Sequence, residues 1–165
     1  MADNNINKTN IPLVIGYGNP LRGDDGIGPI VAQQVKMELG KSVNSYVAHG
    51  LTPEVAELVS EASRVVFVDA RRGMDAGAID IAELAADETP PEAWSMGHFL
   101  SPSQVLALAS ALYGHCPSAS LVTIGGERWD EYQQLSDKLS NAVGRASRAV
   151  IRELHRRSGA QPTCA

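Results

Sequence analysis

Three acidic residues and one histidine stand at positions where they can do chemistry. Asp24 and Asp25 follow a glycine-rich stretch behind the apolar residues 11–17, Asp69 directly follows a second apolar segment, and His98 lies in a later connection. Two carboxylates and one imidazole suit a first-row divalent metal and leave coordination positions open. If folding brings Asp25, Asp69 and His98 to one place, the sequence predicts a metal-contacting site there.

Each of these residues also has an ordinary structural interpretation. Asp24 or Asp25 can cap the helix that follows. Asp69 can end its strand by bonding to nearby backbone, and a lone loop histidine such as His98 is more often a surface residue than a ligand. Two adjacent aspartates exceed what one cap needs, so one of the pair is expected to point into a crevice.

The glycines of the first loop allow a second interpretation. Gly16, Gly18 and Gly23 loosely resemble a dinucleotide-binding loop. However, a pyrophosphate needs bare backbone N–H groups at the helix start, where two carboxylates would repel it. The next predicted strand also ends at His49 rather than at an acid for the ribose hydroxyl. A nucleotide-binding enzyme is therefore the weaker alternative.

Hydrophobic patterning predicts the elements that position these residues. Five apolar segments predict strands at residues 11–17, 43–49, 64–69, 78–84 and 120–125. Ile27, Val31 and Val35 recur at a spacing of four and predict a first helix. Thr52-Pro53 predicts the N-cap and first residue of a second helix that ends near Ala62.

Two further helices complete the chain. Ser101 and Gln104 form a capping-box pattern at the start of the third helix. Its apolar face is predicted to carry Val105, Leu108, Ala109 and Leu112. A long last helix is predicted to start near Tyr132 and to use Leu135, Leu139, Val143, Ala146 and Val150.

The order β-α-β-α-β-β-α-β-α predicts an α/β fold, a three-layer αβα sandwich with helices on both faces of a five-stranded, mostly parallel sheet. The third and fourth strands are joined by too few residues for a crossover helix, so the fourth is expected to be an antiparallel edge strand. Ligands bind at the carboxyl ends of the strands in such sheets, which is where Asp25 and Asp69 are expected.

Composition places the chain among globular domains. It has 165 residues, of which 44% are hydrophobic and 20% charged, and its net charge is -5. We expect one domain over residues 11–156, with flexible tails at 1–10 and 157–165. The mild negative charge argues against nucleic acid or a membrane surface as partner. Two cysteines, one of them next to the C-terminus, favour a reducing, cytoplasmic location.

At this point the residues match a known family. The segment from Gly18 to Gly28, Gly-Asn-Pro-Leu-Arg-Gly-Asp-Asp-Gly-Ile-Gly, closely resembles the signature of the hydrogenase maturation endopeptidases. Asp69 and His98 match the family's other two metal-contacting positions. Residues 49–54 resemble the variant found in the branch that serves bidirectional, NAD-reducing nickel-iron hydrogenases, and the whole resemblance covers about residues 11–150.

The resemblance implies a nickel-dependent processing endopeptidase. Members of this family remove a short C-terminal extension from the nickel-loaded large subunit of a nickel-iron hydrogenase. Asp25, Asp69 and His98 are then the catalytic and metal-contacting residues, the nickel is contacted through the substrate, and the partner is the large-subunit precursor. Weaker expectations for substrate contacts are Gly18, Asn19, Arg22, Asp24, His49 and Thr52.

The sequence departs from the family pattern at two places and leaves the mechanism open. Asp25 stands where many relatives carry Glu, and residues 49–52 stand where many carry Gly-Gly-Thr. Nickel can act as a Lewis acid, or it can only position the substrate while a carboxylate such as Asp25 acts as general base. We favour recognition as its first role. A chaperone that checks nickel without cleaving the subunit would use the same three residues.

Overall fold

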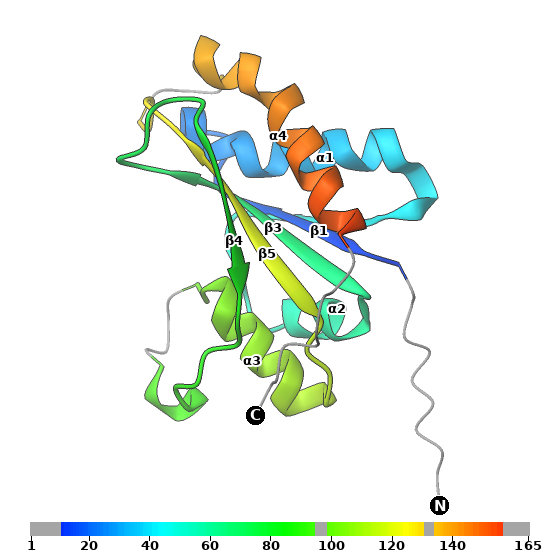
Figure 1. Ribbon diagram of the computed structural model, residues 1–165. Helices are drawn as coiled ribbons and strands as arrows, with labels where there is room; N and C mark the ends of the chain where they lie inside the picture. The colour runs from blue at the N-terminus through cyan, green and yellow to red at the C-terminus, as the bar shows by residue number, and fades with distance from the viewer. Residues whose placement is uncertain (1–10, 95–98, 131–133, 157–165) are drawn as a thin grey trace, which may run out of the picture.

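The computed structural model describes residues 11–94, 99–130 and 134–156 (Figure 1). The predicted tails at 1–10 and 157–165 lie outside these residues. The strands are β1 (Leu13–Tyr17), β2 (Asn44–Ala48), β3 (Arg64–Arg71), β4 (Ile79–Leu84) and β5 (Ser118–Gly125). The α-helices are α1 (Ile27–Leu39), α2 (Val55–Glu61), α3 (Pro102–Tyr113) and α4 (Asp137–His155). Short 3₁₀ turns form η1 (Gly23–Gly26), η2 (Gly40–Ser42) and η3 (Pro91–Ala93).

The five strands form one mixed sheet in the order β2-β1-β3-β5-β4. β1 lies parallel to both β2 and β3, and β3 lies parallel to β5. β4 pairs antiparallel with β5 at the edge of the sheet, which confirms the expectation for the fourth strand. The carboxyl ends of β1, β3 and β5 therefore meet at one edge, where the predicted site residues begin.

Helices cover both faces of the sheet, as the sequence predicts (Figure 1). α1 and α4 pack together on one face, and α2 and α3 pack together on the other. Successive residues of β3 serve the two cores alternately. Val66 and Val68 join the cluster beneath α1 and α4, whereas Phe67 joins the cluster beneath α2 and α3. A strand buried on both faces needs apolar side chains at every position, which explains the unbroken apolar run before Asp69.

The start of α3 confirms its predicted cap. The Ser101 hydroxyl accepts the Gln104 N–H at 3.2 Å, and the Gln104 side chain accepts the Ser101 N–H at 2.9 Å. The predicted apolar face is partly wrong, because Leu106 is buried while Leu112 is 64% exposed. Leu112 lies in the last turn of α3, close to where Gly114 takes a left-handed conformation and ends the helix.

Two other helix starts differ from the predictions. α2 begins at Val55 after Glu54, and no side chain caps it. Thr52 is thus not the N-cap, and its hydroxyl hydrogen-bonds to the Glu54 carboxylate. α4 begins at Asp137, behind a Ser136 hydroxyl cap, rather than near Tyr132, which lies outside the described residues. The Thr52-Pro53 pattern therefore stands before a turn that precedes α2, and Leu135 lies before the first residue of α4 although its spacing fits the helix.

A buried polar network closes the amino end of the sheet. The guanidinium of Arg64, the first residue of β3, lies 3.2 Å from the Glu153 carboxylate of α4. It also donates to the Ser118 and Ser120 hydroxyls, and Ser120 donates to Glu153 at 2.7 Å. Arg64 and Glu153 are only 5% and 9% exposed. Burying two charges costs free energy unless they are paired and hydrogen-bonded. Here the two groups are paired and share hydrogen bonds, and only Nε of the Arg64 guanidinium has no partner among the described residues.

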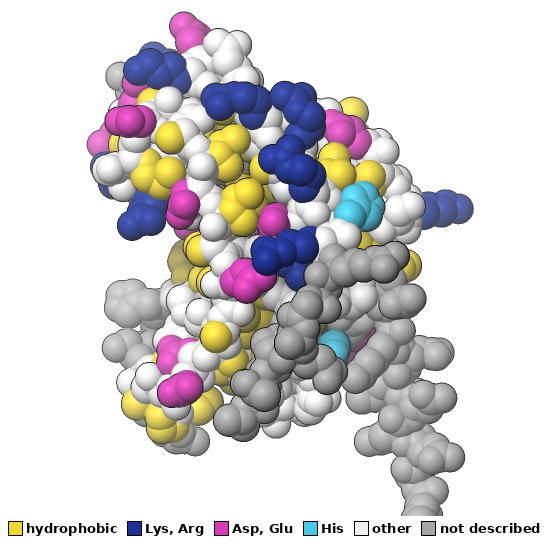
Figure 2. Space-filling view, viewed as in Figure 1, with side chains coloured by type: hydrophobic (Ala, Val, Ile, Leu, Met, Phe, Trp, Pro, Cys, Tyr) yellow, Lys and Arg dark blue, Asp and Glu magenta, His cyan; other side chains and the backbone are white. Residues whose placement is uncertain are grey.

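The outer surface of α4 is basic. Figure 2 shows lysine and arginine side chains gathered over this part of the molecule. Arg145, Arg148 and Arg152 are exposed and follow each other at helical spacing along α4. Among the described residues, no helix is long and apolar enough to cross a bilayer.

Candidate active site

The loop after β1 is held in place by close backbone packing. A side-chain carbon at Gly16 would lie 2.2 Å from the Gly28 carbonyl oxygen, and one at Gly28 would lie 2.5 Å from the Val68 carbonyl oxygen. Only glycine permits such distances, so the start of α1 rests directly on β1 and β3. The structure thus accounts for these glycines by contacts within the chain.

Gly18 shapes the turn that leads to the acidic pair. Its φ of 137° lies in a region that L side chains rarely adopt, and a side-chain carbon there would overlap the Asp25 carbonyl oxygen. Its N–H bonds to the Ala48 carbonyl at the end of β2. Gly18 was predicted to contact substrate, and the structure gives it this local role.

Asp24 is fully buried and ties two distant loops together. Its carboxylate accepts the N–H groups of Ser136, Glu127 and Arg128 at 2.7, 2.8 and 2.9 Å. Burial acts to raise the pKa of Asp24, but these hydrogen bonds outweigh it and hold the pKa below its usual value. Asp24 is therefore a charged structural anchor for the β5–α4 connection, not the substrate contact that the resemblance implied.

Asp25 is the member of the pair that remains partly exposed. One carboxylate oxygen accepts the Asn19 N–H at 2.8 Å. The Asn19 side chain in turn accepts the Leu21 N–H at 2.9 Å, so Asn19 orders the loop around Asp25. Asp24 thus has the structural role, while Asp25 stays partly exposed, and its place in a crevice stays a prediction.

Asp69 lies within β3, next to the end of β1. One of its oxygens accepts the Ala70 N–H at 2.8 Å. Burial raises the pKa of Asp69 to about 6; hydrogen bonds from the Tyr17 hydroxyl and the Ala70 N–H oppose this rise, and the nearby charge of Asp25 adds to it. The structure therefore brings Asp25 and Asp69 into electrostatic contact, as the topology predicts.

Tyr17 is a site residue that the sequence interpretation missed. Burial and the Asp69 carboxylate raise the pKa of the Tyr17 phenol, so the hydroxyl stays protonated and acts as a donor. The available signal was that Tyr17 ends the first predicted strand and Asp69 follows the apolar run of the third, two strands that the structure pairs. Reading that pairing residue by residue would have placed the two side by side.

His98 lies outside the described residues, so its contact with the carboxylates stays a prediction. The chain directly after it is well defined. Leu100 forms an isolated bridge with Leu51, and the Phe99 ring packs where a side chain on Gly50 would stand, 2.2 Å from its Cγ atom. The connection that contains His98 thus returns beside the segment after β2.

The weaker candidates receive separate roles. His49 is exposed at the end of β2, and Thr52 bonds to Glu54. Arg22 lies 3.3 Å from Asp130 in an exposed ion pair, which holds the first loop near the β5–α4 connection. The Asp25 N–H also donates to the Arg22 carbonyl at 3.4 Å, and substrate contacts by these three residues stay a prediction.

The rim of the site contains a second unpredicted contact. The Arg72 guanidinium stacks 4.5 Å from the centre of the Trp129 ring. Trp129 also lies over Gly126, where an added side-chain carbon would meet its ring at 2.8 Å. These residues belong to the connections that follow β3 and β5, so they border the same edge of the sheet as Asp69.

The charge of the site is unbalanced. Within residues 11–94, 99–130 and 134–156, no lysine or arginine forms an ion pair with Asp25 or Asp69. Over the same residues, no three histidine, cysteine or acidic side chains gather closely enough to hold a metal ion. Two neighbouring carboxylates, one with a raised pKa, form an incomplete donor set that would be stabilised by an external cation.

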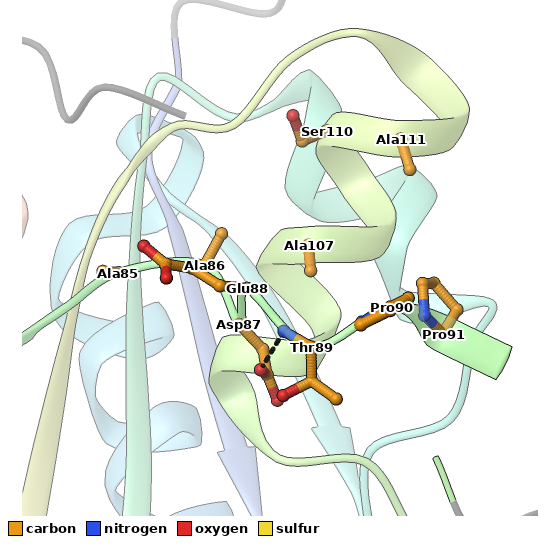
Figure 3. A pocket seen from close by; sticks show the side chains of 10 residues that line it. All are labelled: Ala85, Ala86, Asp87, Glu88, Thr89, Pro90, Pro91, Ala107, Ser110 and Ala111. Atoms are coloured by element: carbon orange, nitrogen blue, oxygen red, sulfur yellow. Dashed lines mark hydrogen bonds between the residues drawn. The ribbon is translucent and has the colours of Figure 1, made fainter. Parts of the chain in front are cut away.

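A separate pocket of about 300 Å³ lies between α3 and the segment after β4 (Figure 3). Asp87 and Glu88 contribute carboxylates to its lining, and Ala107 and Ala111 contribute small apolar side chains from α3. Neither Asp25 nor Asp69 lines it. Its acidic groups do not suit a phosphate, so the pocket gives no support to the nucleotide-binding alternative.

Fold and site together define a three-layer α/β protein with two neighbouring carboxylates at the carboxyl edge of its sheet. No protein-family model matches the chain, and no curated protein sequence matches it significantly. Solved structures do share the fold. The hydrogenase maturating endopeptidase HybD from E. coli matches with a TM-score of 0.65 and 21% identity, over 85% of this chain and 89% of that chain.

Two archaeal structures give the same result. The [NiFe] hydrogenase maturation protease HycI from Thermococcus kodakarensis matches with a TM-score of 0.65 and 24% identity, over 88% of this chain and 93% of that one. A hydrogenase 2 maturation peptidase from a Thaumarchaeota archaeon matches with a TM-score of 0.62 and 22% identity, over 88% and 98%. These similarities establish the predicted α/β fold.

Proposed function

We propose that this chain is a processing endopeptidase of the hydrogenase maturation family. It removes the C-terminal extension of a nickel-loaded nickel-iron hydrogenase large subunit. Asp25, Asp69 and His98 contact the substrate's nickel, so that only the metal-loaded precursor is cut. Nickel belongs to the substrate in this proposal and is not a resident cofactor of the enzyme.

The observation that carries this proposal is the unbalanced pair of Asp25 and Asp69. Burial and the neighbouring charge raise the pKa of Asp69 to about 6, and no described cation pairs with either carboxylate. Such a site gains free energy when a cation enters it. The same fold in a solved [NiFe] hydrogenase maturation protease supports nickel as that cation.

His98 completes the proposed contact set from a third connection. The residues that follow it, Phe99 and Leu100, lie against Gly50 and Leu51, behind the end of β2. β2 is the neighbour of β1, whose loop carries Asp25. This placement of Phe99 and Leu100 supports His98 as the third member of the proposed contact set.

We assign the three residues to recognition first. A cation beside Asp69 would lower its pKa again, which weakens the carboxylate as a general base. Nickel held by the substrate would then fix the scissile bond in the cleft and can polarise its carbonyl. Asp25, which is partly exposed, is the better placed of the two carboxylates to accept a proton from an attacking water.

Two finer assignments rest on the sequence. Residues 49–54 support a substrate from the bidirectional, NAD-reducing group of hydrogenases. The presence of only two cysteines in the sequence supports action in the cytoplasm. A panel of large-subunit precursors from several hydrogenase groups would test the first assignment, and fractionation of cells that make the protein would test the second.

The decisive experiment follows peptide release by mass spectrometry from nickel-loaded and nickel-free precursor. We expect wild type to release the C-terminal peptide only with nickel. Asp69→Asn and His98→Ala should each reduce the rate at least about 100-fold, because each removes a contact to the metal. Asp80→Asn is the matched control, since Asp80 is an exposed carboxylate on β4.

The other outcomes are equally informative. A stable complex with nickel-loaded precursor but no cleavage under any condition would establish the nickel-checking chaperone instead. Equal cleavage with and without nickel would remove the metal from the mechanism. Saturable binding of NAD or ATP would favour the nucleotide-binding alternative.

A further inference from the structure

Strand register places Tyr17 beside Asp69. In the β1–β3 pair, Gly16 is opposite Val68, so the next residues along the two parallel strands are Tyr17 and Asp69. Side chains at the same register of parallel strands point to the same face. The Tyr17 ring accordingly packs against the core beneath α2 and α3, which also contains Phe67, two residues before Asp69.

The Tyr17 hydroxyl is hydrogen-bonded to the Asp69 carboxylate. The second described donor to this carboxylate is the Ala70 N–H at 2.8 Å. The Ala70 N–H holds one oxygen of the Asp69 carboxylate. The Tyr17 hydroxyl, whose ring packs in the core, holds the same carboxylate from the neighbouring strand. Together they restrict rotation of a carboxylate that would otherwise turn freely in the cleft.

We propose that Tyr17 is a positioning residue that orients the Asp69 carboxylate toward the substrate's metal without neutralising its charge. This inference rests on the proposed function. An arginine or lysine at the same place would also hold the carboxylate, but its positive charge would cancel the attraction for an incoming cation. A neutral phenol donor gives the orientation and leaves the negative charge in place.

The test compares Tyr17→Phe with Tyr46→Phe in the full chain. Phenylalanine keeps the ring and removes only the hydroxyl. Tyr46 is a matched control because it also packs against the core beneath α2 and α3, but from β2, where it is opposite Ile15. The readout is the affinity for nickel-loaded and for nickel-free large-subunit precursor, together with the thermal midpoint of unfolding.

We expect Tyr17→Phe to bind the nickel-loaded precursor about 10-fold more weakly, since one hydrogen bond to a charged group is lost. Its affinity for nickel-free precursor should stay unchanged. Tyr46→Phe should change neither affinity. An unchanged ratio of the two affinities in Tyr17→Phe would overturn the inference, and an equal loss for both precursors would show that Tyr17 acts only on the structure.

A double-mutant cycle of Tyr17→Phe and Asp69→Asn shows whether Tyr17 acts through Asp69. In an Asp69→Asn background, Tyr17→Phe should cause no further loss of affinity for nickel-loaded precursor. Full additivity of the two changes would overturn the inference. If the wild-type protein binds nickel-loaded and nickel-free precursor equally, the proposed function itself fails. If the wild-type protein prefers nickel-loaded precursor and Tyr17→Phe keeps the same preference, only the inference about Tyr17 fails.

Discussion

The two ends of the sheet both contain buried carboxylates, but they balance the charge in opposite ways. At the amino end, Glu153 lies 3.2 Å from the Arg64 guanidinium and 2.7 Å from the Ser120 hydroxyl. At the carboxyl end, Asp69 meets a neutral phenol and a second acid. Burial acts to raise both pKa values, yet Glu153 ends below its usual value and Asp69 well above it.

This difference separates structural from functional use of charge. At the amino end, the buried polar groups pair with one another, so they stabilise the fold. The carboxyl end holds a carboxylate at a cost in stability, which is typical of sites that wait for a ligand. Asp24 belongs with the amino end in this respect, although it is the neighbour of Asp25, because three backbone N–H groups satisfy it.

The largest expected effect on stability is at the amino end. Arg64→Met leaves Glu153 buried beside Ser120, with Arg156 at 3.5 Å as its remaining cation. We expect the free energy of unfolding to fall by about 3 kcal/mol. Urea unfolding at neutral pH measures it, with Arg148→Met on the exposed face of α4 as control, for which we expect a change within about 0.5 kcal/mol. Equal effects for the two variants would show that the buried network does not stabilise the fold.

The second prediction contrasts the adjacent aspartates. Asp24→Ala leaves three backbone N–H groups without their acceptor, so we expect a loss of about 2–3 kcal/mol. Asp25→Ala removes one acceptor at a partly exposed position and should cost about 1 kcal/mol or less. The same unfolding measurement ranks them. A larger effect for Asp25 would reverse our division of the pair into anchor and site residue.

The third prediction concerns pH. The folded pKa of Asp69, about 6, exceeds the value of 3.8 for an unperturbed aspartate, so the folded state binds more protons between these values. Its contribution to stability is therefore complete below about pH 4 and is lost as the pH rises to about 6. We expect a loss of about 3 kcal/mol across this window.

Asp69→Asn provides the control for this pH dependence. The variant should lack the loss and become more stable than wild type above about pH 6. Asp24 and Glu153 have lowered pKa values, so their contributions are present above their unfolded pKa values and disappear only as the pH falls through the folded ones. Parallel stability curves for wild type and Asp69→Asn would contradict a raised pKa at this position.

The smallest effects are expected at the rim of the site. Arg22→Gln removes an exposed ion pair with Asp130, and Arg72→Ala removes the stacking on Trp129. Each should change the free energy of unfolding by about 0.5 kcal/mol or less. If either variant weakens binding of the precursor more than it weakens the fold, the rim contacts substrate directly. Isothermal titration alongside thermal unfolding separates these cases.

The sequence alone determined the elements and their order. Apolar runs and capping residues act over a few positions, so the strands, the capping box at Ser101 and the antiparallel edge strand were predicted from local pattern. The convergence of Asp25 and Asp69 was also predicted, because carboxyl ends of parallel strands meet at one edge. Helix starts at α2 and α4 were predicted wrongly, since spacing does not show where a turn becomes helix.

Only the tertiary structure decided what each acid does. Asp24 is the anchor because its partners, Glu127, Arg128 and Ser136, come from segments 103 to 112 residues away. Tyr17 meets Asp69 through strand register, and the pKa of Asp69 depends on burial and on the charge of Asp25. Desolvation and electrostatic interaction depend on distance in space, which residue types and spacing along the chain do not contain.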